Sequence, residues 1–147
     1  MIETINELEQ LLKIGLKYFS QSSELELSLK VADEKWSKKE ILGHLIDSGI
    51  NNLQRFTEIQ FENKPYIIRK YNQNELVKVN DYQHANTNEI VEFWVSLNNR
   101  IQCVMELQTE KTLSYTIELE KNNTSDLRFL MKDYVAHLAH HLKQITK

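Results

Sequence analysis

The chain has 147 residues, a formal charge of −3, and only three glycines and one proline. This length predicts one domain over residues 1–147, with a core large enough to fold without disulfides or a structural metal. Acidic and basic residues are interspersed, which excludes the basic stripe of a nucleic-acid-binding protein, and no apolar run approaches the roughly 18 residues of a membrane span.

The scarcity of glycine and proline favours a mostly helical chain, because long helices exclude both residues from their interiors. The first residues lack the basic and then apolar pattern of a secretion signal. The single cysteine, Cys103, cannot form an intramolecular disulfide, and it falls beside the apolar face of an expected helix. We therefore expect a cytoplasmic protein in which Cys103 is buried and unreactive.

The first helix is expected over residues 2–19, where apolar side chains recur at helical spacing. These side chains are Ile5, Leu8, Leu12, Leu16 and Phe19. Residues 24–31 then alternate with a period of two, which would suit a short strand, and residues 112–119 alternate in the same way. The two runs could pair as a minor short β pair, or each could be an extended crossing segment.

A second helix is expected over residues 37–60, because Ser37 and Glu40 have the spacing of a capping box. Its expected apolar arc comprises Ile41, Leu45, Gly49, Phe56 and Ile59. A polar strip beside that arc comprises His44, Asp47, Ser48, Asn51, Arg55 and Glu58. We interpret Arg55 and Glu58 as part of a solvated face, whereas His44 is a candidate functional residue because it lies beside the apolar arc.

From residue 61 to residue 86 the helical pattern fails, although residues 72–76 could form one helical turn. Antiparallel neighbours need only a few connecting residues, so a linker of this length allows the second and third helices to run in the same direction. The predicted fold class is therefore all-α: an up-down-down-up four-helix bundle with a long crossover between the second and third helices. His84 lies in the crossover, and we expect it to be exposed.

The third helix is expected to start at Asn86 or Thr87 and to end near Leu107, with Trp94 in the core. Residues 121–124 are expected to form a turn, after which Ser125 or Asp126 caps the fourth helix. The apolar arc of the fourth helix comprises Leu127, Leu130, Met131, Tyr134, Leu138, Leu142 and Ile145.

Three of the five histidines lie in the fourth helix. His137 and His141 are four residues apart, so both imidazoles lie on one helical face and can reach one metal ion. His140 points roughly 100° away from them and is left out of the site. A catalytic site of three protein groups needs one more ligand, and only His44 and His84 remain.

Two segments resemble the DinB/YfiT-like superfamily of small metal-binding four-helix bundles. The first comprises Trp36-Ser-Lys-Lys-Glu-Ile-Leu-Gly-His44-Leu-Ile-Asp-Ser48 and Asn51-Asn-Leu-Gln-Arg-Phe56, and the second is Asp133-Tyr-Val-Ala-His137-Leu-Ala-His-His141-Leu-Lys-Gln-Ile145. The expected order of helices extends the match over nearly the whole chain. The resemblance implies a divalent metal ion bound by His44, His137 and His141, with water or substrate completing its shell.

Members of this superfamily include proteins described as metal-dependent hydrolases and transferases that attach low-molecular-weight thiols to electrophiles, and many members have no known reaction. The predicted function is therefore that of a metal-dependent enzyme acting on a small molecule. Both reactions use the same three ligands, because a divalent ion acidifies either a bound water or a bound thiol. Zinc or nickel is the expected metal, and iron or manganese also accept imidazole. The alternative is a non-catalytic metal-binding or structural four-helix bundle. Under either interpretation the chain could form a homodimer.

Two carboxylates near the histidines are candidates for orienting the imidazoles by accepting from their free ring nitrogens. They are Asp47, three residues after His44, and Asp133, four residues before His137, and either could instead be an exposed helical carboxylate. The candidate substrate contacts are Asn51, Tyr71 and Gln73.

Overall fold

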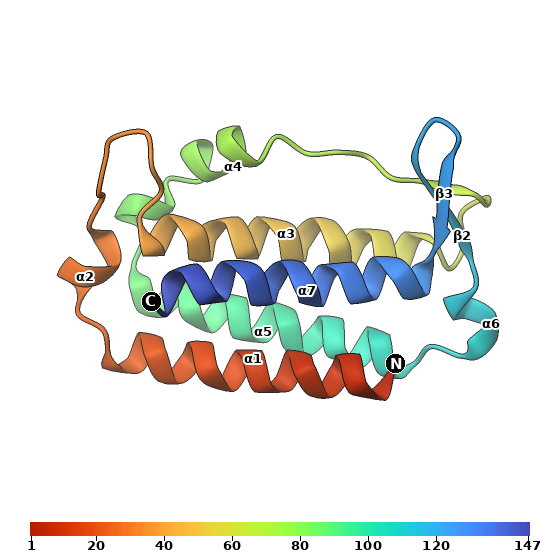
Figure 1. Cartoon of the computed structure of the whole chain (residues 1–147), viewed down its shortest axis with the longest axis horizontal. Helices are drawn as coiled ribbons and strands as arrows, with labels where there is room; N and C mark the ends of the chain where they lie inside the picture. Colours follow the sequence, from red (N-terminus) through yellow and green to blue (C-terminus); the bar gives the residue numbers. More distant parts are fainter.

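The computed structural model describes residues 1–147 and places most of them in four long helices. The helices are α1 (Ile2–Gln21), α3 (Lys38–Glu58), α5 (Thr87–Glu106) and α7 (Leu127–Ile145). α1 and α7 run in one direction, whereas α3 and α5 run in the other (Figure 1). The predicted up-down-down-up four-helix bundle is therefore confirmed. None of the helices has the length and apolar character needed to cross a membrane.

Side-chain caps set the starts of three of these helices. The Ser37 hydroxyl accepts a hydrogen bond from the Glu40 amide at 3.1 Å, and the Glu40 carboxylate accepts from the Ser37 amide at 2.9 Å, as the sequence predicts. At the starts of α5 and α7, Asn86 Oδ1 accepts from the Glu89 amide and Asp126 Oδ1 accepts from the Phe129 amide, without a reciprocal bond. Each cap satisfies a backbone donor that has no partner within the helix. The capping box fixes the start of α3 less than two turns before His44.

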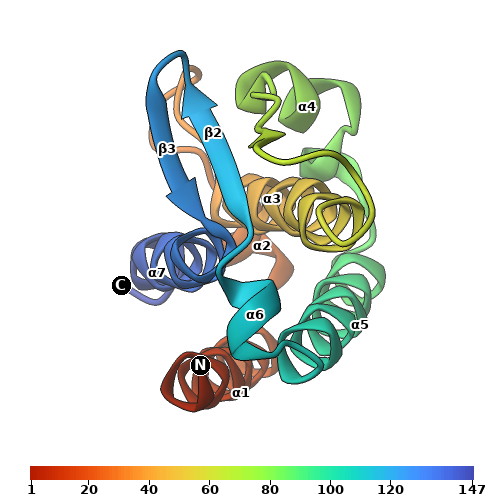
Figure 2. The ribbon, with the colours of Figure 1, turned by 90° about the vertical axis from the view of Figure 1, so that its right-hand side faces the viewer.

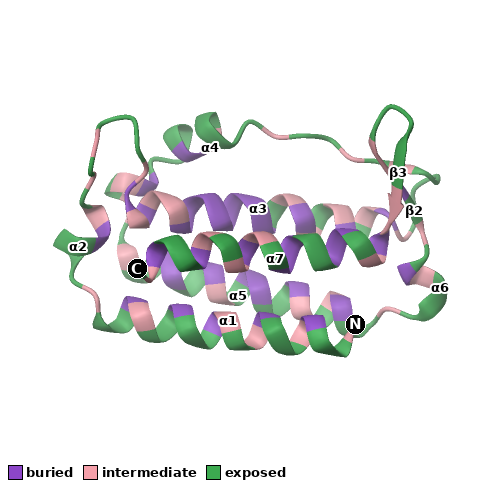
Figure 3. Ribbon diagram, viewed as in Figure 1, coloured by how far each residue is buried: buried purple, intermediate pink, exposed green.

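The apolar arcs expected from helical spacing form most of the bundle core (Figure 3). Two expectations about burial are wrong. Leu16 is 47% exposed, because the inner position of α1 at this level is Gly15, where a Cβ would lie only 2.6 Å from Trp94 Cη2. Cys103 is also exposed, because Ile101 and Met105 occupy the inward-facing positions of α5 around it. Helical spacing alone therefore does not determine whether a side chain at the edge of an apolar arc is buried.

The crossover between α3 and α5 returns along the outer side of α3 (Figures 1 and 2). It contains strand β1 (Tyr66–Ile67), helix α4 (Gln73–Val79) and the 3₁₀ helix η1 (Tyr82–His84). The predicted helical turn is confirmed as α4, which Asn72 caps. His84 is exposed, as expected. This return path brings the chain back to the end of the bundle where α3 begins, so α5 can run parallel to α3.

A small sheet closes the other end of the bundle. β1 pairs in parallel with β2 (Thr116–Glu120), and β2 pairs in antiparallel fashion with β3 (Asn123–Asp126). The second alternating run is thus partly a strand, preceded by the short helix α6 (Glu110–Leu113). The turn predicted over residues 121–124 comprises only residues 121 and 122, because β3 already begins at Asn123. Asn122 adopts a left-handed conformation with φ 63°. Asparagine tolerates this conformation better than most residues.

The strand expected over residues 24–31 is wrong, and therefore so is its pairing with the later run. These residues begin with the short helix α2 (Glu24–Ser28), in which Leu27 is buried. The Ser23 hydroxyl accepts from the Glu26 amide, which stabilises a helical turn at this point. A local cap therefore outweighs a period-two apolar pattern that is only a few residues long.

Gly43 allows the crossover to lie against α3, and replacing it tests this contact. A Cβ at this position would overlap the ring of Tyr82 in η1. We expect Gly43→Ala to lower the free energy of unfolding by about 1–3 kcal/mol through overpacking. In a Tyr82→Ala background the same change should be neutral or stabilising by up to about 1 kcal/mol, because alanine favours the helix. Urea unfolding of the four proteins measures this coupling, and equal destabilisation in both backgrounds would contradict it.

Candidate metal centre

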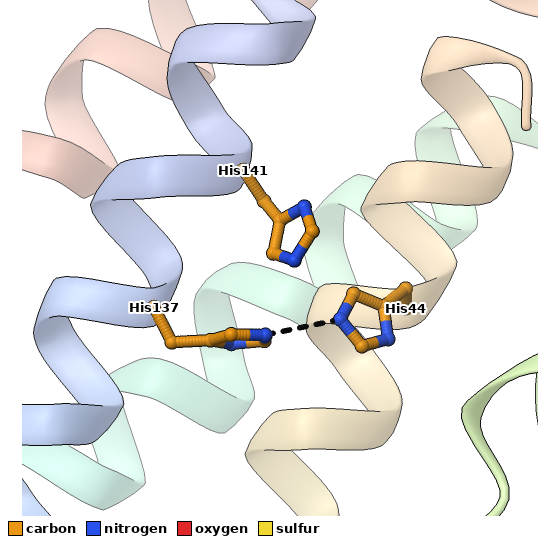
Figure 4. Close-up of side chains that lie close together, drawn as sticks. All are labelled: His44, His137 and His141. Carbon is orange, nitrogen blue, oxygen red and sulfur yellow. Dashed lines mark hydrogen bonds between the residues drawn. The ribbon is translucent and has the colours of Figure 1, made fainter.

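Three histidines converge between α3 and α7 (Figure 4). His44 projects from α3, His137 and His141 project from α7, and one ring nitrogen from each lies within 4.8 Å of the other two. His44 is fully buried, whereas His137 and His141 are partly exposed. The structure therefore brings together the three histidines selected from the sequence, and His140 lies exposed beside them.

The ring nitrogens of these histidines face one another rather than a carboxylate. His44 Nε2 lies 3.1 Å from His137 Nε2. His137 Nδ1 is 3.4 Å from the Ser48 hydroxyl, and His141 Nδ1 is 2.9 Å from Gln144 Oε1. A neutral imidazole has one donor and one acceptor nitrogen, so donation from Nδ1 to Gln144 leaves the lone pair of His141 on Nε2. His44 Nδ1 is buried and has no hydrogen-bond partner.

Burial lowers the pKa of all three imidazoles. The pKa values of His44 and His137 fall to about 4, mainly through loss of solvent and further through the charge of the neighbouring histidines. Loss of solvent also lowers the pKa of His141, against an opposing contribution from its hydrogen bond to Gln144. The three side chains are therefore neutral at pH 7, which is the protonation state in which imidazole binds a metal.

This set of donors fits a divalent metal ion. In a tetrahedral site, imidazole nitrogens roughly 2.0–2.1 Å from zinc lie about 3.3 Å apart, close to the 3.1 Å between His44 Nε2 and His137 Nε2. The cluster also has the lone pairs to coordinate a cation, because its three rings are neutral and hydrogen-bond to no carboxylate.

The two carboxylates expected to orient the histidines lie apart from them. Asp47 is buried, and its Oδ1 accepts hydrogen bonds from the Tyr82 hydroxyl at 2.6 Å and from Asn80 at 3.1 Å. Burial raises the pKa of Asp47, although both hydrogen bonds act to lower it. Asp133 is exposed on α7 and makes no hydrogen bond to His137. In this structure Asp47 therefore connects α3 to the crossover, and neither carboxylate contacts an imidazole.

Two of the three candidate substrate contacts line an open groove of about 990 Å³ between α3 and the crossover. Asn51 also donates to the Asp47 carbonyl at 2.9 Å, and Tyr71 lies under the Arg55 guanidinium. Gln73 is exposed and does not line the groove, and neither do the three histidines. Arg55 and Glu58, which were interpreted as part of a solvated face, are partly exposed and line the wall of this groove.

Three neighbours of the histidines were not predicted as site residues from the sequence. Ser48 and Gln144 contact ring nitrogens, and the Trp36 ring lies 5.0 Å from that of His44, tilted by 33°. Helical spacing could have found Ser48, four residues after His44, and Gln144, three residues after His141. Trp36 precedes α3, so the path of the loop places its ring, and sequence periodicity could not have found that contact.

Comparison with known proteins places this architecture among related folds. A family model described as the DinB superfamily matches residues 7–145. The structure is similar to that of YfiT from Bacillus subtilis, described as a probable metal-dependent hydrolase with an unusual four-helix bundle topology. The TM-score is 0.86 at 21% sequence identity, and the match covers 98% of this chain and 82% of YfiT.

A second similar structure is that of the mycothiol-dependent maleylpyruvate isomerase, with a TM-score of 0.76 and 12% identity. The match covers 97% of this chain but only 59% of the isomerase, which is therefore considerably longer than the shared fold. A search of curated protein sequences finds no match. At these identities the two structural matches establish a shared fold.

The low pKa of the histidines predicts how the stability of the metal-free protein varies with pH. The pKa of His44 is about 4 in the folded state, whereas an unperturbed histidine has a pKa near 6.5. Between these values the unfolded chain binds more protons, so the free energy of unfolding should fall as the pH falls from 6.5 to 4. His44 should contribute at most about 3 kcal/mol to that loss.

Urea unfolding at several pH values in the presence of a chelator measures this dependence. His44→Gln should lose less stability than the wild type over the same pH range. His84→Gln, which removes an exposed histidine, is the matched control. Parallel pH profiles for the wild type and His44→Gln would show that His44 does not change its protonation on unfolding.

Proposed function

This chain belongs to the DinB superfamily, and from that premise we propose that it is a metal-dependent enzyme acting on a small molecule, with His44, His137 and His141 as its metal ligands. The observation that supports the proposal most is the convergence of three neutral imidazoles from two helices within 4.8 Å. The partial exposure of His137 and His141 supports access by a substrate from solvent.

A divalent ion, zinc or nickel in the first place and iron or manganese otherwise, would supply Lewis acidity to an oxygen or sulfur atom of the reactants. The protein's own groups hold the ligands in position. Trp36 packs beside the His44 ring, and Gln144 accepts from His141 Nδ1, which leaves Nε2 of that ring free. His44 is fully buried, so water does not reach the cluster from the side of α3.

We further propose hydrolysis as the reaction class, with thiol transfer as the second candidate. The similarity to YfiT, described as a probable metal-dependent hydrolase, supports the first. The similarity to a mycothiol-dependent isomerase supports the second. Asn51 and Tyr71 remain proposed contacts for a part of the substrate that lies away from the metal, because both line the groove beside α3 and the histidines do not.

Elemental analysis of the untagged protein tests the ligands. We expect about one metal ion per chain in the wild type and almost none in His44→Ala, His137→Ala or His141→Ala, because removing one of three ligands leaves only a weak pair. His140→Ala is the matched control, since it removes an exposed histidine from the same helix, and it should keep its metal. Equal loss in His140→Ala, or full metal content in His44→Ala, would contradict the assignment.

The reaction class can be tested with the metal-loaded protein. We expect hydrolysis of an ester or amide from a chromogenic panel at a rate at least 100-fold above that of the metal-free protein and of His44→Ala. Conjugation of glutathione or cysteine to a bimane electrophile reports the second candidate. Metal-dependent conjugation without hydrolysis would favour thiol transfer. Full occupancy with neither activity would favour a non-catalytic role in binding metal.

A further inference from the structure

The groove between the second half of α3 and the crossover is separate from the histidine cluster. Asn51, its lining residue nearest to His44 in the sequence, is seven residues further along α3, which corresponds to about 10 Å of helix rise. A volume of about 990 Å³ lies within the usual range for small-molecule sites. The groove could therefore hold a ligand whether or not the histidines hold a metal ion.

Arg55 is a partly buried cation in the wall of this groove without an anionic partner. Its Nη2 donates to the Arg69 carbonyl at 2.6 Å, and Nη1 makes a long contact of 3.4 Å with Asn52 Oδ1. No carboxylate lies within ion-pair distance of the guanidinium. A guanidinium has five N–H donors, so some remain available to a ligand. Burial lowers the pKa of Arg55, which is the direction expected for a cation that has lost solvent without gaining an anion.

None of the acidic groups of the groove forms an ion pair with Arg55. The Glu58 carboxylate accepts hydrogen bonds from the Tyr66 hydroxyl and from Gln54, each at 2.7 Å. Lys70 forms an ion pair with Glu120 at 2.6 Å. The remaining charges, which belong to Arg69, Glu62 and Glu75, are exposed, so water and salt screen them more strongly than the partly buried guanidinium.

Apolar surface lies close to this cation. The Arg55 guanidinium is 5.5 Å from the centre of the Tyr71 ring, and Leu76 and Val79 of α4 also line the groove. A guanidinium presents donors in a planar fork that matches the two oxygens of a carboxylate. We propose that this groove binds a small organic carboxylate, with its anionic group on Arg55 and its apolar body against Tyr71 and α4.

Titration of the ¹⁵N-labelled full chain with benzoate, and with benzamide as its neutral isostere, tests the proposal by nuclear magnetic resonance. Benzoate should bind with a dissociation constant in the millimolar range and shift the amides around Asn51, Arg55 and Tyr71. Benzamide and inorganic phosphate should each bind at least tenfold more weakly, because one lacks the charge and the other lacks the apolar body.

Arg55→Gln should weaken benzoate binding at least tenfold and leave benzamide binding unchanged. Arg100→Gln, which removes an exposed arginine of α5, is the matched control and should bind benzoate as the wild type does. Metal-free protein and His44→Ala should also bind benzoate normally, which separates this test from that of the metal centre. If Arg55→Gln does not fold, Arg55→Lys keeps the charge without the fork, and it should bind benzoate more weakly than the wild type.

Several results would overturn the proposal. Equal binding of benzoate and benzamide would show that the charge is not recognised, and equal binding of phosphate would show that the apolar wall contributes nothing. Equal weakening of both aromatic probes in Arg55→Gln would assign Arg55 a purely structural role through its contact with the Arg69 carbonyl. Shifts confined to another surface would place the site elsewhere.

Discussion

The packing of other elements around α3 is the constraint on which both candidate sites depend. Eight consecutive residues, Leu42–Gly49, are buried, although they include His44, Asp47 and Ser48. A helix normally buries one stripe, and burial all round requires neighbours on every side. α5, α7 and the crossover provide them (Figure 2). Gly43 and Gly49 allow this close approach, because a Cβ at either position would collide with Tyr82 or Leu97.

Burial of polar side chains in such a helix requires that each finds a partner, and the partners define two sides of α3. On the side of α7, His44 meets the other two histidines in an environment that keeps imidazoles neutral. On the side of the crossover, Asp47 accepts from Tyr82 and Asn80, and the groove begins beyond it at Asn51. α3 therefore separates the histidine cluster, which is suited to binding a metal cation, from the groove, whose wall contains the cationic side chain of Arg55.

Features that depend on neighbouring residues in the sequence could be predicted. Contacts that depend on where a distant segment packs, such as those of the crossover, could not. The capping box at Ser37 and the spacing of His137 and His141 are local, so they gave the start of α3 and the shared face of α7 correctly. Spacing could not decide the burial of Leu16 or Cys103 at the edges of their arcs. The hydrogen bond between Tyr82 and Asp47 and the partial burial of Arg55 both depend on where the crossover lies. No pattern within α3 encodes that position.

The long sequence separation within the histidine cluster has a consequence for how the protein is made. His44 and His137 touch across 93 residues, and α7 is the last helix of the four. During synthesis from the N-terminus, α3 therefore leaves the ribosome well before the helix that covers its histidine. α7 carries both a part of the apolar interior and two of the three histidines, so nascent chains that lack α7 cannot yet assemble the cluster. The arrival of one helix thus couples maturation of the site to completion of the fold.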